Sequence, residues 1–150
     1  MTAKKMIDEF LAQKPVAVIG VSRDPQKFGY ICFRDLKMRG FPVIPVNPNV
    51  NSIDGEECYP DLKSLPEKAA AALIVVPPEQ TEKVIKEALE CGIRYVWMQK
   101  GSESVKAVEF CMNNGINLIH NECILMFAQP VESIHKFHRF FVKILGRLPK

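Results

Sequence analysis

A glycine that ends an apolar run, followed by a polar loop, is the first feature of the sequence that could bind a ligand. The stretch VAVIGVSRDPQKFGY covers residues 16–30. Gly20 allows a sharp turn and a close approach of the backbone to a ligand. Ser22 offers a hydroxyl group, and Arg23 and Lys27 offer positive charge. A helix after such a loop presents unpaired N–H groups that favour an anion. The stretch is therefore predicted to bind a phosphate group; the alternative is a plain strand-to-helix turn with solvated basic side chains.

The spacing of the glycines argues against the NAD-binding loop of a dehydrogenase. In the pattern GxGxxG a second glycine stands two residues after the first, whereas Ser22 holds that position here and Gly29 comes nine residues after Gly20. NAD-binding domains also need an acidic residue about 20 residues further on, which binds the ribose hydroxyls. Asn47 and Asn49 stand near that position instead. NAD is disfavoured, and a nucleotide with an additional ribose phosphate, such as NADP or coenzyme A (CoA), is not.

Alternating segments of the chain predict the elements that would position this loop. Short apolar runs rich in β-branched residues are typical of strands covered by helices on both faces. Such runs occupy residues 16–20, 41–46, 71–76, 95–99 and 116–119. Apolar residues at helical spacing, with proline or glycine after them, predict helices. These cover residues 3–13, 29–39, 79–91 and 102–114. The order predicts an α/β, Rossmann-like doubly wound fold with a mostly parallel five-stranded sheet, which binds ligands at the carboxyl ends of its strands.

Composition limits the class of protein. The chain has 150 residues, of which 47% are hydrophobic and 25% charged, and its formal net charge is +3. These values are ordinary for one globular domain and too weakly basic to indicate a nucleic-acid partner. No apolar run reaches the ~20 residues of a membrane helix, and the N-terminus lacks the pattern of a signal peptide. A single domain over residues 1–150, located in the cytoplasm, is expected.

The cysteines and histidines indicate free thiols rather than a metal site. The five cysteines are Cys32, Cys58, Cys91, Cys111 and Cys123. An odd number without a CxxC pair is typical of a reducing compartment. His120 lies three residues before Cys123, and His135 three before His138. Two such pairs are a weak set of zinc ligands, so no metal is predicted.

The C-terminal segment predicts an amphipathic helix, as an extension over residues 130–150. Its apolar face would carry Ile134, Phe137, Phe141, Ile144, Leu145 and Leu148, and its opposite face is basic. We expect this helix to pack on the domain, where it shields a sheet face or contributes to a homodimer. Binding of the basic face to acidic lipids or to an acidic partner is the alternative, and membrane association is not favoured.

The motifs together resemble the CoA-binding domain family, small single-domain proteins similar to the N-terminal domain of the alpha subunit of succinyl-CoA synthetase. The matching residues are VIGVSRDPQKFGY, VIPVNPN, IDGEECYPDLKSLP, VVPP, WMQKG and NEC, in that order between residues 16 and 123. The resemblance implies that CoA is the cofactor, with its pyrophosphate surrounded by the loop after the first strand. The implied residues there are Gly20, Ser22, Lys27, Gly29 and Tyr30, and Arg23 of the same loop is a further candidate.

The later strand ends would hold the rest of the cofactor. Asn47 and Pro48 would border the adenosine ribose and its phosphate. The segment Val76, Pro77 and Pro78 would form an apolar wall for the adenine or the start of the pantetheine arm, because proline lacks an N–H donor and presents a rigid surface. The alternative for both prolines is simple strand termination before a helix. Gln99, Lys100 and Gly101 would reach the outer part of the ligand.

Three functions fit this interpretation. We favour a protein that binds CoA or acyl-CoA without catalysis of its own, because no triad or carboxylate pair stands out. The alternatives are an NADP-dependent oxidoreductase-like protein and the CoA-binding component of a multi-chain acyl-CoA ligase. The resemblance to succinyl-CoA synthetase ends before that enzyme's phosphorylated histidine. Cys123 is expected to be structural, with a mixed disulfide to the CoA thiol as the alternative.

Overall fold

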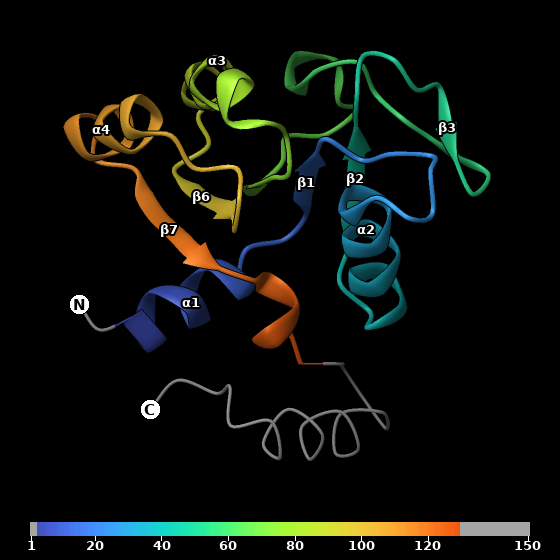
Figure 1. Ribbon diagram of the computed structural model, residues 1–150, viewed down its shortest axis with the longest axis horizontal. Helices are drawn as coiled ribbons and strands as arrows, with labels where there is room; N and C mark the ends of the chain where they lie inside the picture. The colour runs from blue at the N-terminus through green and yellow to red at the C-terminus, as the bar shows by residue number, and fades with distance from the viewer. Residues whose placement is uncertain (1–2, 130–150) are drawn as a thin grey trace.

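The computed structural model describes residues 3–129, and at its centre lies a parallel sheet of five strands (Figure 1). The strands are β1 (Val16–Ile19), β2 (Val43–Val46), β5 (Ala71–Ile74), β6 (Tyr95–Gln99) and β7 (Asn117–Glu122). Each overlaps one of the predicted strands, and every pairing in this sheet is parallel. The predicted fold class is confirmed. The helix predicted over residues 130–150 lies outside the described residues.

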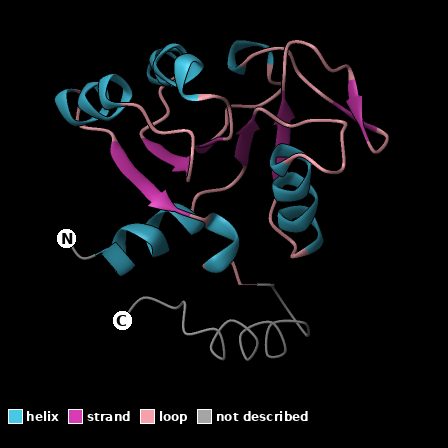
Figure 2. Cartoon of the chain, in the orientation of Figure 1, coloured by secondary structure: helices cyan, strands magenta, loops and turns pink. Residues whose placement is uncertain are grey.

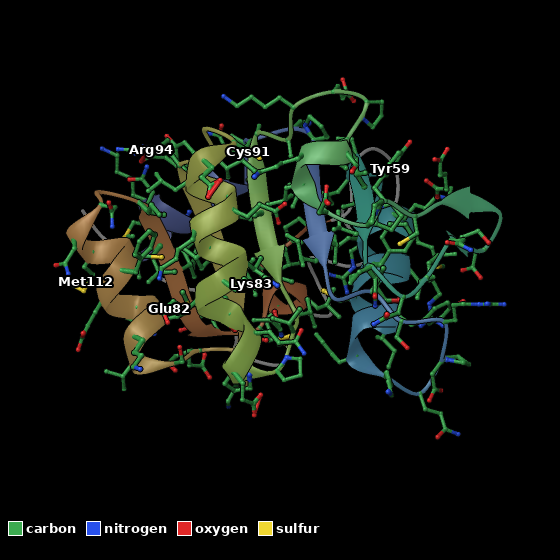
Figure 3. The ribbon with its side chains drawn as sticks, turned by 90° about the horizontal axis from the view of Figure 1, so that it is seen from above. Tyr59, Glu82, Lys83, Cys91, Arg94 and Met112 are labelled. Atoms are coloured by element: carbon green, nitrogen blue, oxygen red, sulfur yellow. The ribbon has the colours of Figure 1, made fainter. Side chains whose placement is uncertain are left out.

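Helices cover both faces of the sheet, as the apolar strands require. One face carries α1 (Ala3–Leu11) and α2 (Phe28–Met38), and the other carries α3 (Pro78–Glu90) and α4 (Val105–Asn113) (Figures 1 and 3). Two clusters of buried apolar side chains fill the space between sheet and helices, one on each face. Trp97 is fully buried in the first cluster and meets Phe10 edge-on, with ring centroids 5.3 Å apart.

The turns from helix to strand follow the predicted glycines. Gly40, Gly92 and Gly115 each stand one residue past a helix C-cap and have φ angles of 91°, 80° and 66°. After α2, the Phe41 N–H donates to the carbonyl of Leu36 at 3.1 Å, and the Gly40 N–H donates to that of Lys37 at 3.0 Å. This pair of bonds defines a Schellman motif, which satisfies the last carbonyls of the helix.

A small hairpin between β2 and β5 is absent from the sequence-based prediction. Its strands are β3 (Ser52–Ile53) and β4 (Glu56–Glu57), and it projects beyond the β2 edge of the sheet (Figure 2). Asp54 and Gly55 form its turn, with φ angles of 48° and 84°. Two consecutive residues with positive φ, in the order Asp-Gly, are typical of a type I′ hairpin. Two short 3-10 helices, η1 (Leu62–Ser64) and η2 (Ile124–Met126), complete the described elements.

The order of the strands fixes where a ligand site is expected. The order is β2-β1-β5-β6-β7. After β1 the chain forms β2 on one side of it, and then crosses over to form β5 on the other side. This reversal opens a crevice at the carboxyl ends of the two strands on either side of it, β1 and β5. In the part of the chain that the structure describes, no helix is both long and apolar enough to span a membrane.

Candidate functional site

The loop between β1 and α2 lies at the predicted edge of the sheet and is tied together by its own side chains. Ser22 accepts a hydrogen bond from the N–H of Asp24 at 3.0 Å, and the Asp24 carboxylate accepts one from the N–H of Gln26 at 2.9 Å. The side chains of Arg23 and Lys27 are exposed. The loop is thus a short ordered turn from which two cations extend into solvent.

Two glycines allow this loop to pack directly on the sheet. A Cβ atom on Gly20 would stand 2.6 Å from the carbonyl oxygen of Val75, and one on Gly29 would collide with the carbonyl oxygen of Gly20. The first turn of α2 therefore rests on the end of β1, which in turn touches the end of β5. This packing places the N-terminus of α2 over the crevice between the two strands.

Asn47 joins the end of β2 to the same loop. Its Nδ2 donates to the carbonyl of Val21 at 2.6 Å, and its Oδ1 accepts from the N–H of Asn49 at 2.8 Å. Both ends of the amide are therefore bonded to backbone. Pro48, directly after it, is exposed at the same edge. The structure brings these two predicted residues next to the β1–α2 loop, and the Asn47 side chain holds the loop in place.

A polar hollow of about 340 Å³ lies between the β1–α2 loop, α2 and the hairpin. Its lining residues are Arg23, Tyr30, Ser52, Ile53, Asp54 and Gly55. Arg23 and Tyr30 were predicted from sequence, whereas the hairpin residues were not. The signal that could have found them is the Asp-Gly turn, because such a turn after β2 must fold a hairpin back at the carboxyl edge.

Tyr30 and Asp54 close one side of this hollow. The Tyr30 hydroxyl donates to Oδ2 of Asp54 at 2.9 Å, and the Arg34 guanidinium lies 5.5 Å from the Tyr30 ring centroid. The hydrogen bond to Asp54 raises the pKa of Tyr30, with a smaller contribution from burial. The bond fastens the hairpin to α2 across residues far apart in the sequence.

The end of β5 supplies the apolar side of the crevice. Val76 is buried, and its Cγ1 atom lies close to Gly20, whereas Pro77 and Pro78 are exposed. Pro77 is the N-cap of α3 and Pro78 its first residue. Proline is favoured at that helical position because its missing N–H needs no partner there. The geometry thus fits helix initiation and leaves the outer faces of both proline rings open to a ligand.

Of the residues predicted at the end of β6, Gln99 is buried and Gly101 lies on the surface. Gln99 is 4% exposed, and its Oε1 accepts a hydrogen bond from the N–H of Ile124 at 3.0 Å. Gly101 is exposed, and its N–H donates to Oε1 of Glu103 at 2.8 Å. The other oxygen of Glu103 accepts from the N–H of Asn121 at 3.3 Å. Glu103 therefore connects the ends of β6 and β7, a role that the sequence analysis missed.

Two of the three charged side chains in the loop before α2 are cationic, since Arg23 and Lys27 stand beside the single carboxylate of Asp24. Lys27 is the N-cap residue, no described side chain caps this helix end, and its first turn contains no acidic residue. The N-terminus of a helix carries partial positive charge, so a lysine there is unfavourable unless a negative group is bound nearby. The Tyr30 N–H already donates to the Lys27 carbonyl at 3.1 Å, so the N–H groups of Phe28 and Gly29, together with Arg23 and Lys27, are the donors that a phosphate at this helix N-terminus would use.

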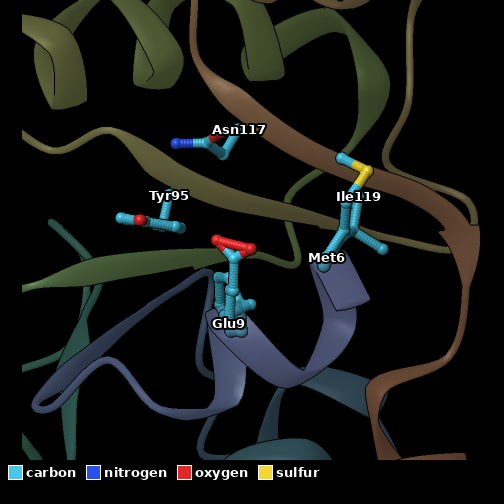
Figure 4. Close-up of a pocket in the computed structure, with 6 residues that line it drawn as sticks. Met6, Glu9, Tyr95, Asn117 and Ile119 are labelled. Carbon is cyan, nitrogen blue, oxygen red and sulfur yellow. The ribbon is translucent and has the colours of Figure 1, made fainter. Parts of the chain in front are cut away.

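Near the opposite edge of the sheet, the residues that the structure describes form a much smaller space. A small pocket there lies between α1 and the first residues of β6 and β7, lined by Met6, Glu9, Phe10, Tyr95, Asn117 and Ile119 (Figure 4). The side chains leave no room in it for a bound molecule. Among residues 3–129, no cluster of three or more potential metal ligands occurs, and all five cysteines are unpaired.

Comparison with known proteins agrees with this geometry. The model of a CoA-binding domain family matches residues 14–129. The chain belongs to this family. The CoA-binding domain is 32% identical over 130 residues to the alpha subunit of an ADP-forming acetate–CoA ligase of Pyrococcus furiosus, and the match covers 79% of the chain but only 28% of that subunit. The family resemblance read from the motifs is confirmed.

Other relatives of the CoA-binding domain are about as short as this chain. An uncharacterized protein of Bacillus subtilis is 27% identical over 123 residues, with 81% of this chain and 91% of that protein covered. A conserved hypothetical protein of Pyrococcus furiosus with a solved structure is 38% identical and superimposes with a TM-score of 0.70. That match covers 73% of this chain and 94% of the other. The domain therefore occurs both in small proteins and as one part of longer ligase subunits.

Proposed function

We propose that the protein binds CoA or an acyl-CoA, with the nucleotide at the carboxyl edge of β1 and β5, and that it performs no catalysis alone. The observation that carries this proposal is the uncapped N-terminus of α2, where Lys27 and the nearby Arg23 face solvent. A pyrophosphate there would accept hydrogen bonds from the first N–H groups of the helix. It would also neutralise the unfavourable lysine.

The surroundings suggest how the rest of the cofactor would lie. The adenosine end, with its ribose phosphate, would enter the hollow past Pro48 at the end of β2, with the phosphate toward Arg23 and away from Asp54, which also lines the hollow. Val76, Pro77 and Pro78 would then carry the start of the pantetheine arm toward Gly101 at the end of β6. Since Asn47 and Gln99 already bond to backbone groups, they would act by shaping the site.

The experiment that tests this function is calorimetric titration with CoA, dephospho-CoA, NADP and NAD. CoA should bind more tightly than dephospho-CoA, because the ribose phosphate adds a charge-assisted contact. Lys27→Ala should weaken CoA binding by about tenfold, which corresponds to about 1.4 kcal/mol. The matched control is Lys83→Ala, which removes the same charge from the exposed face of α3 (Figure 3). Binding of NADP but not CoA would overturn the proposal in favour of an oxidoreductase-like protein.

A second role, as the CoA-binding component of a multi-chain acyl-CoA ligase, is favoured by one observation. The chain is similar to the ligase alpha subunit and spans 28% of its length, so in such an assembly it would supply the CoA-binding part. Co-purification with an ATP-binding protein would support this role. A homodimer, one of the two roles expected for the C-terminal helix, would count against it, and sedimentation of the purified protein distinguishes the two. For either role we expect a reducing, cytoplasmic location.

A further inference from the structure

Strand β7 is the last strand of the sheet, and no strand of the described chain pairs with its free side (Figure 1). On its other side it pairs in parallel with β6, where the Asn117 N–H donates to the carbonyl of Arg94 at 2.8 Å. The backbone groups of successive residues alternate in direction along a strand, so those of Leu118 and His120 point away from β6. The regular part of β7 ends at Asn121, which has a φ of 64°. The free side of β7 therefore offers a short row of unpaired donors and acceptors, to which another strand can bind.

Exposed apolar side chains of α4 lie beside this row. Val105 and Met112 are 75% and 74% exposed, and with the half-buried Val108 they follow one another at helical spacing. The other side of α4 faces α3, where Nζ of Lys86 lies 5.7 Å from the ring centroid of Phe110. Met112 lies on the side of α4 that is turned away from α3 (Figure 3). The α4 stripe, made of Val105, Val108 and Met112, therefore flanks the free side of β7.

The start of β7 carries a basic group beside the end of α4. Nη2 of Arg94 lies 3.5 Å from the position that a Cβ atom of Gly115 would take, and Gly115 stands between α4 and β7. Glu9 also lies near the start of β7, but it belongs to α1 on the other face of the sheet (Figure 4). Among the described residues Arg94 has no salt-bridge partner. Its guanidinium is therefore available to an acidic group from outside.

The end of β7 is acidic. Glu122 is exposed there and has no salt-bridge partner within residues 3–129. Glu103 adds a second carboxylate, against the single cation of Lys100 at the end of β6. A strand with a basic start and an acidic end is complementary to a second copy of itself in the antiparallel direction, since each start then meets the other copy's end. In the parallel direction like charges would meet.

We propose that two copies of the chain form a dimer in which their β7 strands pair antiparallel and join the two sheets into one. About a two-fold axis at Ile119, the backbone of Leu118 exchanges hydrogen bonds with that of His120 of the other copy. The two α4 stripes pack on each other beside the joined strands, and each Arg94 approaches the Glu122 of the other copy. An interface between identical surfaces has to be self-complementary, and this one is so in its backbone, apolar and charged groups. The dimer does not depend on the binding of CoA.

Sedimentation of the full-length protein over a range of concentrations tests the dimer. The parent protein should sediment as a dimer, and Met112→Glu should sediment as a monomer at the same concentrations, because it places one carboxylate from each copy in the apolar contact. Met112 is exposed in the single chain, so its replacement should leave the fold intact, which circular dichroism checks. The matched control is Met38→Glu, at the 70% exposed last residue of α2 on the other face. It should dimerise like the parent protein.

An exchange of charges tests the antiparallel direction. Arg94→Glu and Glu122→Arg should each raise the dissociation constant of the dimer by about tenfold, because each brings like charges together at both ends of the paired strands. The double variant should restore the parent affinity, as expected for residues in contact. The amides of Leu118 and His120 should exchange with deuterium slowly in the parent dimer and rapidly in Met112→Glu. A monomeric parent protein, a dimer that Met112→Glu leaves intact, or a double variant no better than the single ones overturns the proposal.

Discussion

Asn47 illustrates how a single side chain organises the candidate site. Its amide nitrogen donates to the β1–α2 loop at Val21, and its amide oxygen accepts from Asn49, so the end of β2 and the loop over β1 move as one unit. An acidic residue near this place would bind the ribose of NAD in a dehydrogenase. In this protein, the Asn47 side chain directs an N–H donor at the carbonyl of Val21. A carboxylate has no such donor.

Asn47→Asp is the substitution that tests this role. It places a negatively charged oxygen against the Val21 carbonyl, and we expect a loss of about 1–3 kcal/mol in the free energy of unfolding. Asn49→Asp makes the same chemical change at an exposed neighbour and should alter it by no more than about 0.5 kcal/mol. Urea denaturation measures both. Equal stability of the two variants would contradict the structural role of Asn47.

The pKa of Tyr30 gives a second prediction at this scale. Its hydrogen bond to Asp54 raises that pKa above the usual value of 10.0, so the folded protein keeps the phenol proton at a pH where the unfolded chain loses it. The stability from this bond is fully present below pH 10 and is lost as the pH rises through the raised pKa. Ultraviolet titration of the three tyrosines should show one above the ordinary range, and Asp54→Asn should return it. An unchanged titration in that variant would contradict the assignment.

At the scale of elements, the position of α2 decides whether a site exists. The helix can lie on the end of β1 only because residue 29 has no side chain, since a Cβ there would collide with the Gly20 carbonyl oxygen. From the family resemblance, Gly29 is expected beside the pyrophosphate, and this role stays a prediction. The contact with Gly20 is the additional role that the structure provides.

Gly29→Ala should therefore push α2 away from the sheet. We expect it to cost about 1–3 kcal/mol in the free energy of unfolding, as overpacking does, even though alanine favours helices more than glycine. Met38→Ala, at the exposed last residue of the same helix, serves as the control and should change little. If Gly29→Ala stabilises the protein instead, the proposed contact between α2 and β1 is wrong.

The sequence predicted the main elements well because burial on both faces leaves a strong apolar pattern. All five strands and the helices between them follow from that pattern and from the glycines after α2, α3 and α4. The hairpin was not predicted because its strands, Ser52–Ile53 and Glu56–Glu57, are too short and too polar to show an apolar periodicity. The inward bonds of Asn47 and Gln99 could not be predicted either, since they join residues whose proximity only the folded chain reveals.

For the whole molecule, the two edges of the sheet differ in what they can bind. The carboxyl edge has the crevice between β1 and β5, the polar hollow beside α2 and an uncapped helix end. Near the opposite edge, the pocket that the described residues form beside α1 is too small for a ligand. The central claim is therefore that CoA binds at the carboxyl edge, on the side of β1 and β5.

Backbone amide NMR during a titration with CoA tests this claim most directly, because glycine signals are well separated and the glycines lie at both edges. Gly20 and Gly29 belong to the proposed site, and Gly55 borders the hollow. Gly92 and Gly115, which precede β6 and β7, are internal controls at the opposite edge. We predict large shifts for the first group and none for the controls. Shifts confined to Gly92 and Gly115, or no shifts with CoA at saturating concentration, would contradict the account.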